Sequence, residues 1–200
     1  MRWSYGVVTA IERKEDLLPR TLDSLCEGGF DKPRLFVDGC NDPKLYEHFG
    51  LEVTVRYPRI IFGANHILAL LELYIRNSRA DLFALFEDDF VTYINLRQYL
   101  ETCEYPKTGY WNLYTFPQNQ NLAPKDDKPC WFLSNQYGRG AVALVFNRDA
   151  LITFFSKPYV LKSISETKGW KSIDGVILTS FKQSGWKEYC HNPSLVQHTG

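Results

Sequence analysis

Short apolar runs alternate with segments of helical periodicity through the first half of the chain. Leu17, Leu18, Leu22 and Leu25 recur at the spacing that brings them onto one helix face, and Gly28-Gly29 ends this pattern. The same reasoning predicts strands over 5–10, 33–38, 53–55 and 82–86, and helices over 17–25 and 64–76. This alternation is typical of an α/β domain whose mixed, mostly parallel central sheet is flanked by helices.

The second half of the chain is less regular. Its apolar positions predict strands over 109–116 and 141–147, and helices over 149–155 and 174–183. Polar stretches predict exposed loops over 119–129 and 163–172, and a terminal tail over 192–200. The abrupt close of the sequence is compatible with a domain excised from a longer chain.

The composition is that of an ordinary globular chain. With 200 residues, 44% of them hydrophobic and 23% charged, it favours one domain with an adequate core. Lys plus Arg and Asp plus Glu both number 23, so no net charge draws the chain to a polyanion. We therefore expect no nucleic-acid partner.

Cysteine usage and apolar runs bear on the compartment. The five cysteines are scattered and form no CxxC pair, which favours free thiols in a reducing compartment over a zinc site. Residues 1–10 lack a signal-peptide pattern, and no run approaches the ~20 apolar residues of a membrane span. We therefore expect a cytoplasmic protein without a membrane span.

An acidic triplet follows the predicted strand 82–86. Glu87, Asp88 and Asp89 would repel one another and cost free energy to desolvate at the end of a buried strand. A hard divalent cation relieves both problems, and ligands bind at this edge of open α/β sheets. The triplet predicts a site for Mg²⁺ or Mn²⁺ and a phosphorylated ligand. A solvated acidic turn is the alternative interpretation.

Four further features follow the order used by one enzyme family. Asp38 ends the second predicted strand, 137–141 opens a late strand, 173–175 opens a late helix, and His198 lies in the C-terminal PSLVQHTG. Together with the triplet they resemble the GT-A fold of nucleotide-sugar-dependent glycosyltransferases. The features look especially like those of N-acetylglucosaminyltransferase I and its relatives, and small viral and bacterial glycosyltransferase domains also look similar. The resemblance covers nearly the whole chain, through short motifs whose order and spacing support it.

The resemblance implies how the donor nucleotide is bound. Thr9, Ala10 and Arg13 would border the nucleotide, with Arg13 near a phosphate or the ribose. Asp38 would accept a hydrogen bond from uracil N3 or the ribose, and the helix beginning near Asn65 would flank the base. The implied division is a nucleotide-binding half over residues 1–92 and an acceptor and sugar half over 93–200.

The resemblance also implies the metal and sugar contacts. Glu87 would belong to the donor site and Asp88 would touch the ribose or the metal. Asp89 would bind Mn²⁺ (or Mg²⁺) directly, with His198 as second ligand or phosphate contact. The turn Gly138-Arg139-Gly140 would let the backbone approach the sugar, because glycine has no Cβ.

Asp174 is the candidate for the catalytic base. In an inverting transferase a carboxylate deprotonates the acceptor hydroxyl as that hydroxyl attacks the sugar. A retaining enzyme would not need Asp174 in this role. The other interpretation of Asp174 is a cap of the late helix, since Ser172-Ile173-Asp174 has good capping chemistry.

Other site residues also keep a structural alternative. His198 follows the apolar Leu195-Val196 and could be structural, Asp38 could cap the turn at Gly39, and Arg139 could pair with a surface carboxylate.

Several aromatic and histidine residues outside the motifs carry weaker expectations. We expect Trp111 in the core, and Trp131 and Trp170 beside loops, where they could stack on acceptor sugars. His66 is expected on a helix surface or beside the nucleotide, and His191 on the surface.

The predicted function is metal-dependent transfer of a sugar from a UDP-sugar to a hydroxyl acceptor, in the first place a glycan. A sugar-nucleotide nucleotidyltransferase is the first alternative, but it would carry a glycine-rich basic loop where this chain has Thr9 to Arg13. A non-catalytic carbohydrate-binding module is the second, and it would have no reason to keep the acidic triplet.

Overall fold

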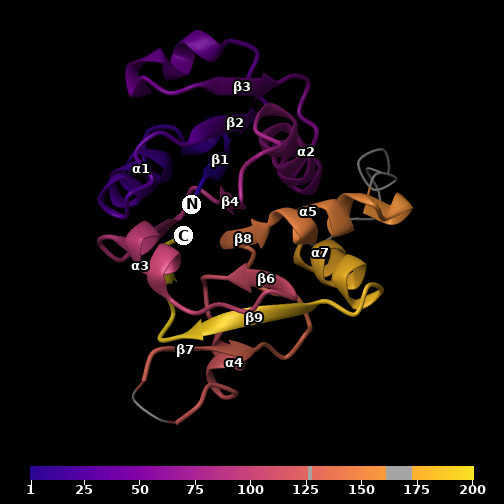
Figure 1. Ribbon diagram of the computed structural model, residues 1–200. Coiled ribbons are helices and arrows are strands. Elements are labelled where there is room, and N and C mark those ends of the chain that lie inside the picture. Colours follow the sequence, from indigo (N-terminus) through magenta and orange to yellow (C-terminus); the bar gives the residue numbers. More distant parts are fainter. Residues whose placement is uncertain (126–127, 161–172) are drawn as a thin grey trace.

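The computed structural model describes residues 1–125, 128–160 and 173–200 (Figure 1). In this part of the chain an eight-stranded sheet has the order β3-β2-β1-β4-β8-β6-β9-β7. Its strands are β1 (Trp3–Ala10), β2 (Arg34–Asp38), β3 (Val53–Arg56), β4 (Leu82–Phe86), β6 (Gly109–Asn112), β7 (Cys130–Leu133), β8 (Ala143–Asn147) and β9 (Lys187–Asn192). A second sheet pairs β5 (Phe90–Thr92) with β10 (Val196–His198).

Helices cover both faces of the large sheet. In Figure 1, α2 (Phe62–Arg76), α5 (Arg148–Phe155) and α7 (Ile173–Lys182) lie on one side of the strands. On the other side lie α1 (Leu17–Glu27) and α3 (Leu96–Thr102). Short helical turns complete the described elements: η1 (Ile11–Arg13), η2 (Pro43–Phe49) and α4 (Pro117–Gln120).

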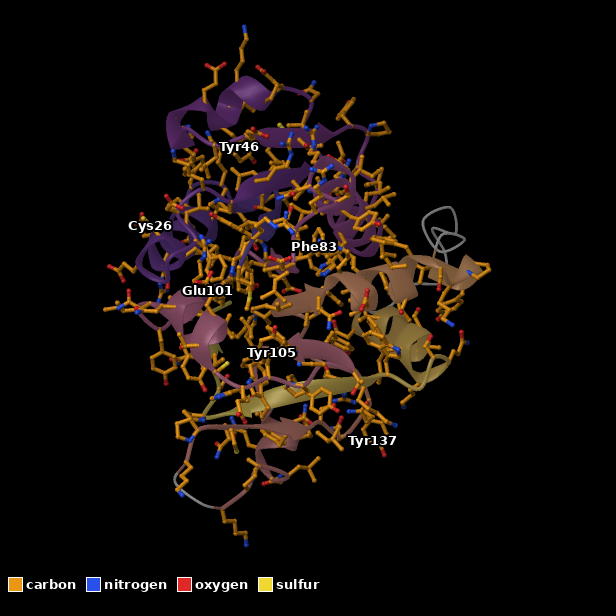
Figure 2. All side chains as sticks on the ribbon, viewed as in Figure 1. Cys26, Tyr46, Phe83, Glu101, Tyr105 and Tyr137 are labelled. Atoms are coloured by element: carbon orange, nitrogen blue, oxygen red, sulfur yellow. The ribbon has the colours of Figure 1, made fainter. Side chains whose placement is uncertain are left out.

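The two helical layers enclose two cores, one on each face of the sheet. One core joins Leu18 and Leu25 of α1 to Leu100 of α3, and the other joins α2, α5 and α7. Phe83 of β4 lies inside the second core, whereas Tyr137 is at the periphery (Figure 2).

The sheet is mixed, as predicted. β3, β2, β1 and β4 are mutually parallel, β6 is parallel to β9, and β8 and β7 run antiparallel to their neighbours. Leu82 to Phe86 of β4 are all buried because β4 has strands on both sides and helices on both faces. The predicted α/β class and its mostly parallel, helix-flanked sheet are confirmed.

Three local predictions are wrong. The segment 192–200 is no simple tail, because β10 pairs with β5 and places His198 opposite Phe90. The predicted strand 109–116 ends at Asn112, and the predicted loop from residue 119 begins inside α4, with Asn119 buried. These elements are three or four residues long, too short for a periodic pattern to reveal. The predicted loop at 163–172 lies outside the described residues, as do residues 126–127 of the predicted loop 119–129.

The predictions for individual tryptophan and histidine residues are confirmed only in part. Trp111 is buried, as predicted. Trp131 lies on β7 and packs against Trp111 and His191, with ring centroids 5.5 and 4.9 Å away, so its ring is engaged within the protein. His191 is buried rather than on the surface, because its ring bonds to Tyr99 and to the Pro193 carbonyl. Trp170 lies outside the described residues.

His66 is completely buried on α2, which contradicts its predicted place on a helix surface. Among the described residues neither ring nitrogen has a hydrogen-bond partner. Burial alone lowers the pKa of His66 to about 3. The imidazole is therefore neutral in the folded protein at every pH at which the protein is expected to work.

This burial predicts an acid-sensitive contribution to stability. The unfolded chain protonates His66 below about pH 6.5, whereas the folded protein resists protonation down to about pH 3. Stability is therefore lost as the pH falls from 6.5 toward 3, by about 1.4 kcal/mol per unit. Between pH 7 and 4.5, His66→Phe should remove about 2–3 kcal/mol of the loss in the free energy of unfolding, measured by urea titration. His48 is exposed, so His48→Phe should leave the pH dependence unchanged. Equal pH dependence in both variants would contradict the assignment.

Candidate functional site

The carboxyl ends of β1 and β4 bring the first site residues together. Val7 pairs with Phe86 in the parallel register, so two residues further on Thr9 lies beside Asp88. The Thr9 hydroxyl donates to Asp88 Oδ2 over 2.5 Å, and both side chains are buried. The predicted Thr9 and Asp88 positions therefore share one point at the centre of the sheet.

Arg13 connects this point to Asp89. Its Nη1 lies 2.7 Å from Asp88 Oδ1 and 2.7 Å from Asp89 Oδ2, reaching both carboxylates from η1. Burial raises the pKa of Asp88, and the hydrogen bonds from Thr9 and Arg13 partly oppose that effect. The guanidinium thus supplies positive charge between two buried acids that would otherwise repel each other.

The small β5–β10 sheet brings His198 to the same acids. His198 Nε2 lies 3.3 Å from Asp89 Oδ2, and the Thr199 amide donates to the Asp89 carbonyl over 2.7 Å. Asp89 Oδ1 is buried and has no hydrogen-bond partner in the described part of the chain. No group of three or more His, Cys, Asp or Glu side chains there is arranged to hold a metal ion. The structure does bring the two predicted metal ligands, Asp89 and His198, within 3.3 Å of each other.

The nucleotide-side residues occupy the next strand ends. Ala10 pairs with Asp38 across β1 and β2, so Asp38 lies at the same sheet edge as Thr9. Asp38 Oδ1 accepts from the Ile60 amide over 2.9 Å, so it fixes the segment before α2 rather than capping the turn at Gly39.

Asn65 has internal partners for its side-chain amide. It donates to the Phe36 carbonyl over 3.0 Å and accepts from Arg56 Nε over 2.8 Å, and it is 1% exposed. It therefore ties α2 to β2 and β3.

The turn Gly138-Arg139-Gly140 faces Asp174, the remaining predicted acid of the site. The amides of Gly140 and Ala141 donate to the Asp174 carboxylate over 2.8 and 3.3 Å. Burial raises the pKa of Asp174, and these backbone donors partly offset it. Arg139 between the glycines is exposed, with its guanidinium 5.9 Å from the Phe116 ring centroid. Asp174 thus anchors the predicted sugar-binding turn from the first turn of α7.

Gly138 gives a direct test of how tightly this turn is built. Its φ is +64°, and a Cβ would lie 2.6 Å from the Asp174 carbonyl oxygen. Gly50 has the same φ with open space around it, so both alanine variants share the left-handed strain. Gly138→Ala should lower the free energy of unfolding by an additional 1–3 kcal/mol or so, measured by denaturant titration. Equal losses in Gly138→Ala and Gly50→Ala would contradict this packing.

Glu87 lies between Asp88 and Asp89 on one side and Asp174 on the other. It is half-buried, and burial followed by the charges of Asp89, Asp174 and Asp88 raises the pKa of Glu87 to about 8. Each of these four carboxyls came from the sequence prediction. Their gathering makes the site strongly attractive to a cation or a proton.

Two contributors were missed from the sequence. Tyr114 lies between His198 and Gly140. The ring centroids of Tyr114 and His198 are 6.1 Å apart, and a Cβ added at Gly140 would lie 2.7 Å from the Tyr114 ring. Buried Glu188 accepts from Asn112 Nδ2 over 3.1 Å, and the same nitrogen donates to the Arg139 carbonyl over 3.2 Å. Tyr114 falls inside the predicted strand 109–116, where it has no signal of its own, and an isolated carboxylate such as Glu188 has no local signal.

The fold has counterparts among solved structures. GalNAc-T7 with UDP, GalNAc and Mn²⁺ superposes with a TM-score of 0.68 at 12% identity, over 100% of this chain and 43% of that one. S. aureus TarS gives 0.65 at 12% identity, over 100% and 37%. The chain has a GT-A fold. No protein-family model matches the sequence, and no curated protein matches it.

Other GT-A-like structures extend the comparison. A TarS fragment in complex with UDP superposes with a TM-score of 0.56 at 11% identity, over 95% of this chain and 57% of that one. CMP:2-keto-3-deoxy-manno-octonic acid synthetase with CTP gives 0.53 at 11% identity, over 100% and 94%. This chain spans about two fifths of the length of GalNAc-T7 and TarS, 43% and 37%. No helix in the described residues is both long and apolar enough to cross a bilayer.

Proposed function

We propose that this protein transfers a sugar from a UDP-sugar to a hydroxyl acceptor, with Mn²⁺ or Mg²⁺ as cofactor. The single observation that carries the proposal is the buried Asp89 carboxylate. It follows the central strand β4 of a GT-A fold, lies beside His198, and has one oxygen without a hydrogen-bond partner among the described residues. The neighbour GalNAc-T7 was solved with UDP, a sugar and Mn²⁺, which supports the choice of donor and cofactor.

The residues present fit a divalent cation. A partnerless buried carboxylate oxygen and an imidazole nitrogen are chemically suited to Mn²⁺. Ions of this kind are commonly bound through one or two protein ligands together with substrate phosphates and water. Asp89 and His198 would hold the cation, which supplies positive charge for the diphosphate leaving group when bound.

The reaction exchanges one bond for another at the anomeric carbon. The acceptor oxygen forms a bond to that carbon, the bond from the carbon to the phosphate oxygen breaks, and UDP leaves with the electron pair. The acceptor attacks from the face opposite the phosphate, which inverts the anomeric configuration, and Asp174 takes the proton of the acceptor hydroxyl. Arg13 stabilises the growing negative charge of UDP, and Glu87 and Asp88 complete the donor site.

Arg13 makes an opposite-sign prediction. In the free protein its guanidinium pairs with Asp88 and Asp89, so an arriving cation meets its repulsion. Arg13→Gln should therefore bind Mn²⁺ about tenfold more tightly without nucleotide, and UDP more weakly with Mn²⁺ present. Isothermal titration calorimetry measures both, with the exposed Arg20→Gln on α1 as the control. Unchanged or weaker Mn²⁺ binding by Arg13→Gln would contradict the competition.

A nucleotidyltransferase remains the second candidate, because the structural match to the CTP-bound synthetase covers 100% of this chain and 94% of the synthetase. Against it, the segment after β1 is the acidic-basic turn η1, without glycine. The products separate the two activities. Incubation with UDP-sugars and an acceptor panel should release UDP, whereas nucleotide triphosphates with free sugar phosphates should release no pyrophosphate. The reverse pattern would replace the proposal.

A carbohydrate-binding module is the third candidate function, and the Asp89→Asn variant distinguishes it from a transferase. A module should keep its glycan affinity in Asp89→Asn, whereas a transferase should lose metal-dependent donor binding.

A further inference from the structure

The candidate site opens onto a hollow that none of the assigned donor residues except His198 lines. The hollow has a volume of about 550 Å³ and runs along β5 and β10 and the segment before β10. His198 and Tyr114 are at the end that adjoins the acids. A molecule in this hollow would reach the candidate site without crossing the nucleotide-side residues at β1 and β2.

The lining of the hollow is neutral and rich in hydrogen-bonding groups. Apart from His198 it contains no acidic or basic side chain. Hydroxyl and amide groups alternate with aromatic rings, the combination that suits an uncharged polyhydroxyl ligand. These groups belong to Thr92, Tyr93, Tyr114, Gln120, Ser194 and Gln197.

A second hollow continues from the first and has a different character. It has a volume of about 250 Å³ and shares Tyr93, Pro193 and Leu195 with the first. Ile94 and Leu96 extend an almost wholly apolar lining. His191 also lines it, and burial lowers the pKa of His191, which favours its uncharged form. Because they share three lining residues, the two hollows adjoin; we refer to them together as the groove, which is polar at His198 and apolar at Ile94.

Two neighbouring exposed residues line the groove. Tyr93 is 58% exposed and lines both hollows, and Ile94 is 70% exposed and lines the apolar one. Adjacent exposed apolar residues at a hollow are typical of a surface that contacts a ligand. The place of Tyr93 in both hollows matches a ligand that has both characters.

We propose that this groove binds the acceptor, and that the acceptor is a neutral sugar carrying an apolar aglycone. The sugar lies in the polar hollow, with a hydroxyl directed to His198 and the acids, and the aglycone lies over Ile94 in the apolar hollow. The assignment of this ligand as acceptor rests on the proposed transferase function. The ligand class itself rests on the groove.

The test compares octyl and methyl β-glycosides of the same sugars by calorimetry, below micelle formation. Glucose, galactose, N-acetylglucosamine and N-acetylgalactosamine make up the panel. At least one octyl glycoside should bind the unmodified protein tenfold or more tightly than its methyl counterpart. Equal affinities of every pair, or no binding of any glycoside, would overturn the proposal.

Variants locate the binding on the two hollows. Ile94→Ser should reduce the octyl preference at least threefold and leave methyl-glycoside affinity unchanged. Gln197→Ala should weaken both glycosides at least threefold, because it removes a sugar contact. The controls are Ile75→Ser on α2, where Ile75 is 66% exposed, and Gln98→Ala on α3. Glycoside binding that is unaffected by Ile94→Ser and Gln197→Ala would overturn the assignment to this groove.

Titration of UDP with Mn²⁺ in the same buffer separates this proposal from the proposed function. Octyl-glycoside binding of the expected pattern without any UDP binding would leave the groove standing and remove the transferase. UDP binding without an octyl preference would remove the groove proposal alone.

Discussion

Asp89→Asn should lower sugar transfer by about 10³-fold, because the amide cannot supply the charged oxygen that holds the cation against the diphosphate. Metal-dependent UDP binding should weaken by at least about 100-fold, or some 2.7 kcal/mol. The shape of the side chain is retained, so the loss reflects charge. A continuous assay of UDP release from the UDP-sugar in the presence of acceptor measures the loss of sugar transfer. Calorimetry measures the loss of UDP affinity.

The stability of Asp89→Asn distinguishes a binding role from a structural role. Asp89 lies beside Asp88 and Glu87 and shares the cation Arg13 with Asp88, and repulsion among the three carboxylates opposes folding. The variant should therefore melt at the same temperature as the unmodified protein or higher when no metal is present. The exposed Asp23→Asn on α1 should change neither activity nor melting temperature. Lost activity together with a lower melting temperature would assign Asp89 to the fold instead.

Asp174→Asn is the second large effect. If its carboxylate takes the acceptor proton, kcat should fall by about 10²–10⁴-fold. UDP affinity should change less than about threefold, because the Asn carbonyl can still accept a hydrogen bond from the Gly140 amide. Product configuration, determined by NMR, should be inverted relative to the donor in the unmodified enzyme.

A matched variant isolates the helix position from the chemistry. Asp149 is the second residue of α5 as Asp174 is the second residue of α7, and both are acids in a first helical turn. Asp149→Asn therefore reproduces any loss of helix-dipole interaction, and it should leave kcat unchanged. A fall in kcat below tenfold for Asp174→Asn, or retention of configuration, would reduce Asp174 to the anchor of the Gly138–Gly140 turn.

The sequence predicted the part of the site that local patterns encode. An apolar run that stops at Glu87-Asp88-Asp89 identifies both β4 and the acids that follow it. A five-residue buried strand between charged turns can be recognised from the sequence alone. The resemblance to GT-A enzymes added Thr9 and Arg13, and the β1–β4 register brings both to Asp88.

The remainder depended on contacts between distant segments. The pairing of β10 with β5 positions His198, and Asn65 is buried because Arg56 and Phe36 bind its amide. Likewise, the glycines of the turn fit against Asp174 and Tyr114 of the protein itself. Three-residue strands and single buried polar residues carry no periodic signal, so their roles emerge only when the sheet is assembled.

The proposed function depends on a cation-dependent uridine diphosphate site at Asp89. Calorimetric titration of UDP in Mn²⁺, repeated in EDTA and with Asp89→Asn, measures this dependence. We expect binding in Mn²⁺ that disappears both in EDTA and in the variant. Absence of UDP binding under all conditions, or equal binding with and without the cation, would contradict it.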